Sequence, residues 1–104
     1  MDITQLLIFT IENGGSDLHI SAGEPPVVRI HGDLRKVEGE FLTQEQTHDM
    51  LYSLLSDHQR MLYEEHFELD FSFSLGNYGR FRVNVFKQLR GDAAVFRTIP
   101  EKIP

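Results

Sequence analysis

Residues 69–99 read LDFSFSLGNYGRFRVNVFKQLRGDAAVFRTI, and this stretch determines the fold class. Apolar and polar residues alternate over 69–75 and again over 81–85, which is the pattern of strands that bury one face. Glycine-containing turn sequences, among them Gly91-Asp92, separate these strands from each other and from a third strand over 93–99. The stretch therefore predicts a three-stranded antiparallel meander.

The last two strands are expected to pair as a hairpin whose loop is centred on residues 89–90. In this register Val83 lies opposite Phe96 on the apolar face, whereas a slip of one residue would set core side chains against polar ones. The same register places Arg82 opposite Arg97 on the other face of the sheet.

Two like charges directly opposite each other repel by a few tenths of a kcal/mol up to about 1 kcal/mol, and two interpretations of the arginine pair are open. In the first, Arg82 and Arg97 each bind a nearby Asp or Glu of this acidic domain. In the second, they form a receptor for a phosphate or carboxylate, which each guanidinium can bind bidentately, with Arg80 on the same face as an auxiliary. The sequence has no GxxxxGK[ST] loop, so a phosphate would have to be held mainly by another part of the protein.

The residues before the meander predict three helices and three short strands. Helical spacing and capping-box sequences predict one helix over residues 3–11 and two consecutive helices that begin after Thr43 and Ser56. Short strands are expected over 17–21, 27–31 and 34–37. This order predicts an α+β fold for residues 1–99, a PAS-like domain in which helices pack on one face of an antiparallel sheet. Residues 100–104, Pro-Glu-Lys-Ile-Pro, are expected to begin a linker.

Composition excludes several classes of function. The chain has 104 residues, 40% of them hydrophobic and 25% charged, which is ordinary for one globular domain. It has no cysteine, so disulfides and thiolate chemistry are excluded and a cytoplasmic location is expected. The apolar stretch Leu6–Phe9 is far shorter than the ~20 residues that span a bilayer. A formal net charge of -6 repels a phosphate backbone and argues against nucleic acid as a partner.

Other polar residues offer weaker candidates for a site. The five histidines lack the HxxxH or HExxH spacing that places two imidazoles on one helical face, so we expect no metal site. The acidic cluster of Glu64, Glu65, Glu68 and Asp70 is more typical of a solvated surface than of general acid–base catalysis. We therefore expect no catalytic residue in this chain.

Five segments carry a more specific pattern when they are taken together and in this order: MDITQLL (1–7), GSDLHISAG (15–23) followed by Pro25-Pro26, DFSF (70–73), GRFRVNVF (79–86) and VFRTIP (95–100). They closely resemble the type IV pilus retraction ATPases of the PilT family, within the secretion ATPase superfamily. The resemblance covers essentially the whole chain.

This resemblance implies that the chain is the N-terminal domain of a homohexameric ATPase motor that powers pilus retraction and twitching motility. It implies a PAS-like domain at residues 1–99 and, at residues 100–104, the start of a linker to a RecA-like ATPase domain that is absent here. That absent domain carries the Walker motifs and holds ATP and Mg mainly by itself, so the parent is expected to be an ATPase while this fragment is not an enzyme and binds no cofactor. The implied location is the cytoplasm, peripheral at the inner membrane.

The implied partners are the C-terminal ATPase domains of the same and neighbouring subunits, together with inner-membrane pilus machinery. In the wider superfamily, arginines of the N-terminal domain sense the γ-phosphate of the nucleotide. The matching positions here are Arg82, in Arg-Val-Asn, and Arg97, in Phe-Arg-Thr, with Arg80 as a possible auxiliary. The alternative function is a stand-alone PAS-like sensor of a small ligand.

Overall fold

The computed structural model describes residues 2–37, 39 and 41–100. Within these residues three helices and six strands follow one another as α1 (Ile3–Glu12), β1 (Gly15–Ser21), β2 (Val27–Ile30), β3 (Asp33–Lys36), α2 (Gln44–Tyr52), α3 (Asp57–His66), β4 (Glu68–Leu75), β5 (Gly79–Gln88) and β6 (Gly91–Ile99). Every helix and strand predicted from the sequence is present, with small shifts at its ends. Residues 101–104 of the predicted linker lie outside the described residues.

Each helix begins at a capping box, as its sequence predicts. The pairs are Asp2 with Gln5, Thr43 with Gln46, and Ser56 with Gln59. In α1, for example, the Gln5 backbone N–H donates to Asp2 Oδ1 at 2.8 Å and the Asp2 N–H donates to Gln5 Oε1 at 2.8 Å. Such caps typically stabilise a helix by about 1 kcal/mol, because they satisfy N–H groups that have no partner inside the helix.

The six strands form one antiparallel sheet in the order β3-β2-β1-β6-β5-β4. The predicted meander of β4, β5 and β6 is confirmed. So is the predicted hairpin register, which places Val83 opposite Phe96 and Arg82 opposite Arg97. β1 pairs with β6 and so joins the meander of β1, β2 and β3 to the meander of β4, β5 and β6. The sequence did not predict this pairing.

The prediction that Gly91-Asp92 forms a turn is wrong. Gln88 pairs with Gly91, so the hairpin loop consists of residues 89–90 and Gly91 is the first residue of β6. Gly91 has a φ of +128°, which explains a glycine at the start of this strand without a turn. Asp92 is 4% exposed and its side chain has partners in the core, which are described below.

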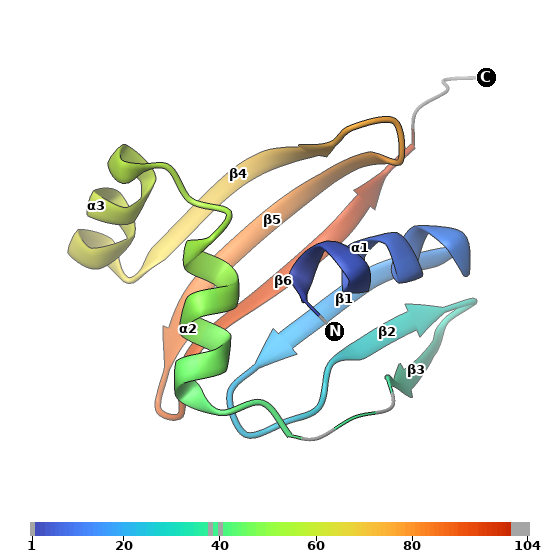
Figure 1. Cartoon of the computed structure of the whole chain (residues 1–104), viewed down its shortest axis with the longest axis horizontal. Coiled ribbons are helices and arrows are strands. Elements are labelled where there is room, and N and C mark those ends of the chain that lie inside the picture. Colours follow the sequence, from blue (N-terminus) through green and yellow to red (C-terminus); the bar gives the residue numbers. More distant parts are fainter. Residues whose placement is uncertain (1, 38, 40, 101–104) are drawn as a thin grey trace.

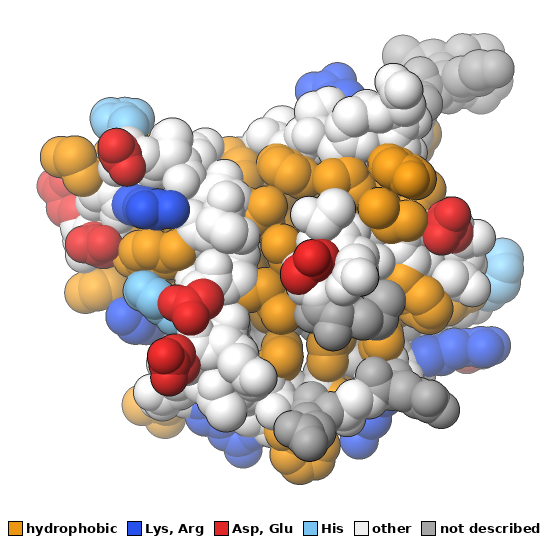
Figure 2. Space-filling view, in the orientation of Figure 1, with side chains coloured by type: hydrophobic (Ala, Val, Ile, Leu, Met, Phe, Trp, Pro, Cys, Tyr) orange, Lys and Arg blue, Asp and Glu red, His pale blue; other side chains and the backbone are white. Residues whose placement is uncertain are grey.

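The helices cover one face of the sheet and leave the other open. Figure 1 shows α1 and α2 in front of the sheet and α3 beside the start of β4. On the helical face, hydrophobic side chains gather between α1 and α2 (Figure 2). The core beneath them includes Leu18, Phe81 and Phe96, each fully buried. This arrangement confirms the predicted α+β class with helices on one face. No helix in the described part of the chain has the length and apolar character needed to cross a bilayer.

Candidate functional site

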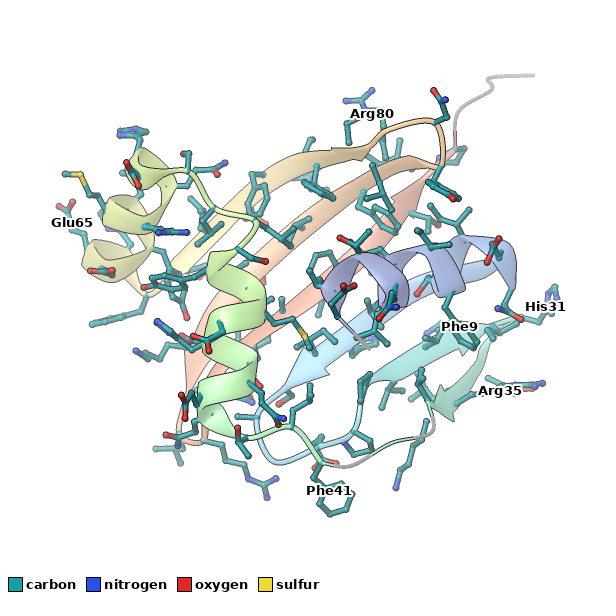
Figure 3. The ribbon with its side chains drawn as sticks, viewed as in Figure 1. Phe9, His31, Arg35, Phe41, Glu65 and Arg80 are labelled. Carbon is teal, nitrogen blue, oxygen red and sulfur yellow. The ribbon has the colours of Figure 1, made fainter. Side chains whose placement is uncertain are left out.

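The open face of the sheet carries the candidate residues because the strands alternate. In β5, Phe81 and Val83 are buried on the helical face, so Arg80 and Arg82 project from the opposite face. In β6, Phe96 is buried and Arg97 is exposed on the open face for the same reason. Arg80 pairs with Ser74 near the end of β4 and with Ile99 at the end of β6, and it lies beside the β4–β5 turn (Figure 3).

One row of residues on the open face crosses all six strands. From β4 to β3 it consists of Ser72, Arg82, Arg97, Asp17, Arg29 and Leu34. The row therefore contains three arginines and a single carboxylate. Asp17 stands between Arg97 on β6 and Arg29 on β2, so one carboxylate serves both of these arginines.

Asp17 is an almost buried carboxylate that binds Arg97 directly. Its residue is 7% exposed, and Arg97 Nε donates to Asp17 Oδ1 at 3.0 Å. Arg29 Nε lies 3.5 Å from Asp17 Oδ2, and Ser16 Oγ donates to the same oxygen at 2.9 Å. The Arg97 side chain is nevertheless 72% exposed. Arg97 is thus bound to a carboxylate without being buried by it.

The pKa of Asp17 follows from these contacts. Burial alone raises the pKa of this carboxyl, but the hydrogen bonds from Arg97 and Ser16 and the positive charge of Arg97 outweigh burial. The pKa of Asp17 therefore lies below its ordinary value of 3.8, and the side chain is ionised at neutral pH. The Arg97–Asp17 contact is an ion pair over the whole physiological range.

Arg82 differs from Arg97. Across residues 2–37, 39 and 41–100, no ion pair or hydrogen bond joins the Arg82 side chain to another residue. The two arginines border a shallow pocket of about 310 Å³ whose lining is Asp70, Arg82, Asn84, Val95 and Arg97. Asn84 Nδ2 donates to Asp70 Oδ1 at 3.1 Å, which occupies the one carboxylate of this lining. The interpretation that both arginines bind carboxylates holds for Arg97 and not for Arg82.

Three of the four carboxylates singled out from the sequence take part in two separate surface contacts, and Glu65 projects outward from α3 (Figure 3). Tyr52 Oη donates to Glu64 Oε1 at 3.0 Å, whereas Asn84 Nδ2 binds Asp70 and, at 3.4 Å, Glu68. These carboxylates do not converge on one reacting position. Among the residues that the structure places, no group of three or more His, Asp or Glu side chains is arranged to hold a metal ion.

A second polar cluster, which sequence reasoning missed, lies on the helical face. Asp92 accepts hydrogen bonds from Tyr63 Oη and, at 2.9 Å, from His48 Nδ1 in the tautomer that carries a proton there. The contacts join β6 to α3 and α2. Burial and the hydrogen bond to Asp92 raise the pKa of Tyr63 well above its usual value. The cluster holds the two helices against the sheet. The sequence did not identify Asp92 as its acceptor, because Gly-Asp is also a common turn sequence.

Comparison with known proteins gives the chain its relatives. No family model matches it. It is 50% identical over 103 residues to the type IV pilus retraction ATPase PilT of Pseudomonas aeruginosa. This match covers 99% of this chain and 30% of that protein. It is 47% identical over 78 residues to a twitching motility protein of Neisseria gonorrhoeae. This match covers 75% of this chain and 21% of that protein.

A solved structure agrees with these relatives. The crystal structure of the pilus retraction motor PilT with bound ADP matches with a TM-score of 0.91 and 41% identity, covering 100% of this chain and 31% of that one. The chain therefore spans less than a third of the length of the proteins it matches. Over its own length the agreement in sequence and fold is continuous, and the chain belongs to the PilT family of type IV pilus retraction ATPases, corresponding to their N-terminal domain.

Proposed function

We propose that the chain is the N-terminal domain of a hexameric ATPase motor that powers type IV pilus retraction and twitching motility from the cytoplasmic side of the inner membrane. Its partners in this proposal are the RecA-like ATPase domains of its own and neighbouring subunits and the inner-membrane pilus machinery. Arg82 and Arg97 contribute to the site by binding the phosphates of a nucleotide held mainly by those ATPase domains, with Arg80 as an auxiliary.

The observation that carries the proposal is the arginine pair at the rim of an open pocket. Two neighbouring guanidinium groups match the charge of a phosphate, and a pocket of about 310 Å³ has room for one. Phosphate binding also offsets the repulsion between the two cations. The pocket does not suit Mg²⁺, because Asp70 is its one carboxylate and already accepts a hydrogen bond from Asn84. Any Mg²⁺ would be held by the ATPase domain.

The proposed mechanism uses the difference between ATP and its product. While the γ-phosphate is present, it attracts both guanidinium groups and holds this domain against the nucleotide. When hydrolysis removes that phosphate, the attraction weakens and the two domains change their relative position, which moves the ring. Relatives that include a PilT structure with bound ADP are consistent with this role, and they do not favour a stand-alone ligand sensor.

The test uses the full-length protein that contains this chain. Arg82→Ala and Arg97→Ala are expected to lower the ATPase rate by roughly tenfold or more, because a positive charge that stabilises the phosphate is lost. Arg35→Ala is the matched control, since Arg35 is an exposed arginine of β3 that pairs with the buried Val28 and so lies outside the row of Arg82 and Arg97. Pilus retraction should fall in parallel with the ATPase rate. Wild-type turnover in both Arg82→Ala and Arg97→Ala would refute the role of the arginines.

A further inference from the structure

The two arginines of the candidate site are held in different ways. Arg97 is bound through Nε to Asp17, whereas none of the placed residues makes a hydrogen bond or ion pair with the Arg82 side chain. The Arg97 contact uses one edge of the guanidinium group. Within the part of the chain that the structure describes, no hydrogen bond or ion pair engages its two terminal Nη groups. Arg97 is therefore oriented and still able to bind.

We propose that Asp17 is a positioning residue, which fixes Arg97 through Nε and leaves the terminal amino groups of Arg97 to bind the phosphate. The inference rests on the proposed function. In this arrangement Arg97 is the preoriented cation of the site and Arg82 is the mobile one, which closes on the phosphate from the neighbouring strand.

Asp17 is suited to this role because it is itself fixed. It lies on β1, which is hydrogen-bonded to β2 on one side and to β6 on the other. Arg29 and Ser16 contact the oxygen of Asp17 that Arg97 does not use. A carboxylate with both oxygens engaged has little freedom to move, so it restricts the rotamers of the long Arg97 side chain before any ligand arrives. Restricting a side chain in advance removes part of the entropy cost of binding.

The charges are compatible with anion binding. Arg29, Arg97 and Arg82 supply three positive charges, whereas Asp17 and the Asp70 carboxylate of the pocket lining supply two negative charges, so the row and the pocket together keep an excess of positive charge. Asp17 therefore orients Arg97 without neutralising the site. If Asp17 only repelled the phosphate, removing its carboxylate would raise activity. If Asp17 positions Arg97, removing its carboxylate lowers activity, and this difference can be measured.

The decisive comparison is between two variants of equal charge, Asp17→Asn and Asp17→Ala, in the full-length protein. Asparagine keeps an oxygen that can accept from Arg97 Nε, and alanine does not. If Asp17 positions Arg97, kcat/KM for ATP is about two- to tenfold lower in Asp17→Ala than in Asp17→Asn, which is the cost of ordering one long side chain. Equal kcat/KM in the two variants, together with a defect in Arg97→Ala, overturns the inference and leaves the proposed function standing.

A double-variant cycle separates positioning from a general loss of structure. Asp17→Ala should change the same kinetic parameter, kcat or KM, as Arg97→Ala does, and should add little when combined with Arg97→Ala. Arg35→Ala is the control, since Arg35 is an exposed arginine of β3 that lies outside the row and should keep most of the activity. Additive effects of Asp17→Ala and Arg97→Ala contradict the inference. Wild-type activity in Arg97→Ala refutes the role proposed for Arg97 and the inference with it.

One measurement needs no substitution and stands even where Asp17→Ala impairs folding. In nuclear magnetic resonance spectra of this 104-residue chain, the Nε–H proton of Arg97 should exchange with water more slowly than that of Arg82, because the first donates to a nearly buried carboxylate. Equal exchange of the two protons overturns the inference.

Discussion

Substituting Tyr63 by phenylalanine tests the cluster that fastens the helices to the sheet. Tyr63 is 1% exposed and Asp92 is 4% exposed, so water cannot replace the hydroxyl that is lost. The lost hydrogen bond has a buried carboxylate as acceptor, and bonds to charged groups contribute about 1.5–3 kcal/mol each. We therefore expect Tyr63→Phe to lower the free energy of unfolding by about 1.5–3 kcal/mol. A total stability of roughly 5–15 kcal/mol makes this a large fraction.

Urea unfolding followed by far-ultraviolet circular dichroism measures this change. With a slope of about 1–2 kcal/mol per M for a domain of this size, the midpoint should move down by about 1 M or more. Tyr78→Phe is the matched control, because it removes the same hydroxyl from a tyrosine that is 52% exposed, and it should change stability by less than about 0.5 kcal/mol. Equal losses in Tyr63→Phe and Tyr78→Phe would refute the argument that the buried bond to Asp92 stabilises the fold.

Three further predictions concern charge. The difference in unfolding free energy between wild type and Asp17→Asn should shrink as pH falls below 3.8. The reason is that a carboxylate whose pKa is lower in the folded state stabilises the fold above its unfolded pKa and loses that effect when it is protonated. A difference that stays constant with pH contradicts this. An ultraviolet absorbance titration should show Tyr52 ionising near pH 12, and Glu64→Gln should lower that midpoint, because burial and then the hydrogen bond to Glu64 raise its pKa. Arg82→Gln should keep the unfolding free energy or raise it by up to about 1 kcal/mol, since it relieves repulsion from Arg97; a clear loss in urea unfolding would show that Arg82 stabilises the fold.

Local patterns in the sequence predicted most of the fold. The capping boxes locate the helix starts because each is a contact between residues three apart. Alternation predicted β4 and β5, and matching the apolar residues of the last hairpin predicted its register, with Arg82 opposite Arg97. These contacts depend on neighbours along the chain or across a two-residue loop, so the sequence contains them directly.

The contacts that escaped prediction join distant segments. Nothing near Asp17 indicates that β1 pairs with β6, and so the carboxylate that binds Arg97 could not be identified. Asp92 follows a glycine, which also suits a turn, and its true partners His48 and Tyr63 come from two separate helices. The paired arginines were therefore predictable from one hairpin, whereas the residue that distinguishes one arginine from the other was not.

The pairing of β1 with β6 affects when Arg97 meets its partner during folding. Arg97 and Asp17 are 80 residues apart, so their contact requires the amino-terminal and carboxy-terminal meanders to have joined. Closing such a long segment costs chain entropy before any contact compensates it, and pairings of this kind form slowly. A chain whose two meanders had not yet joined would display Arg97 without its carboxylate, so Arg97 is oriented only once the sheet is completely assembled.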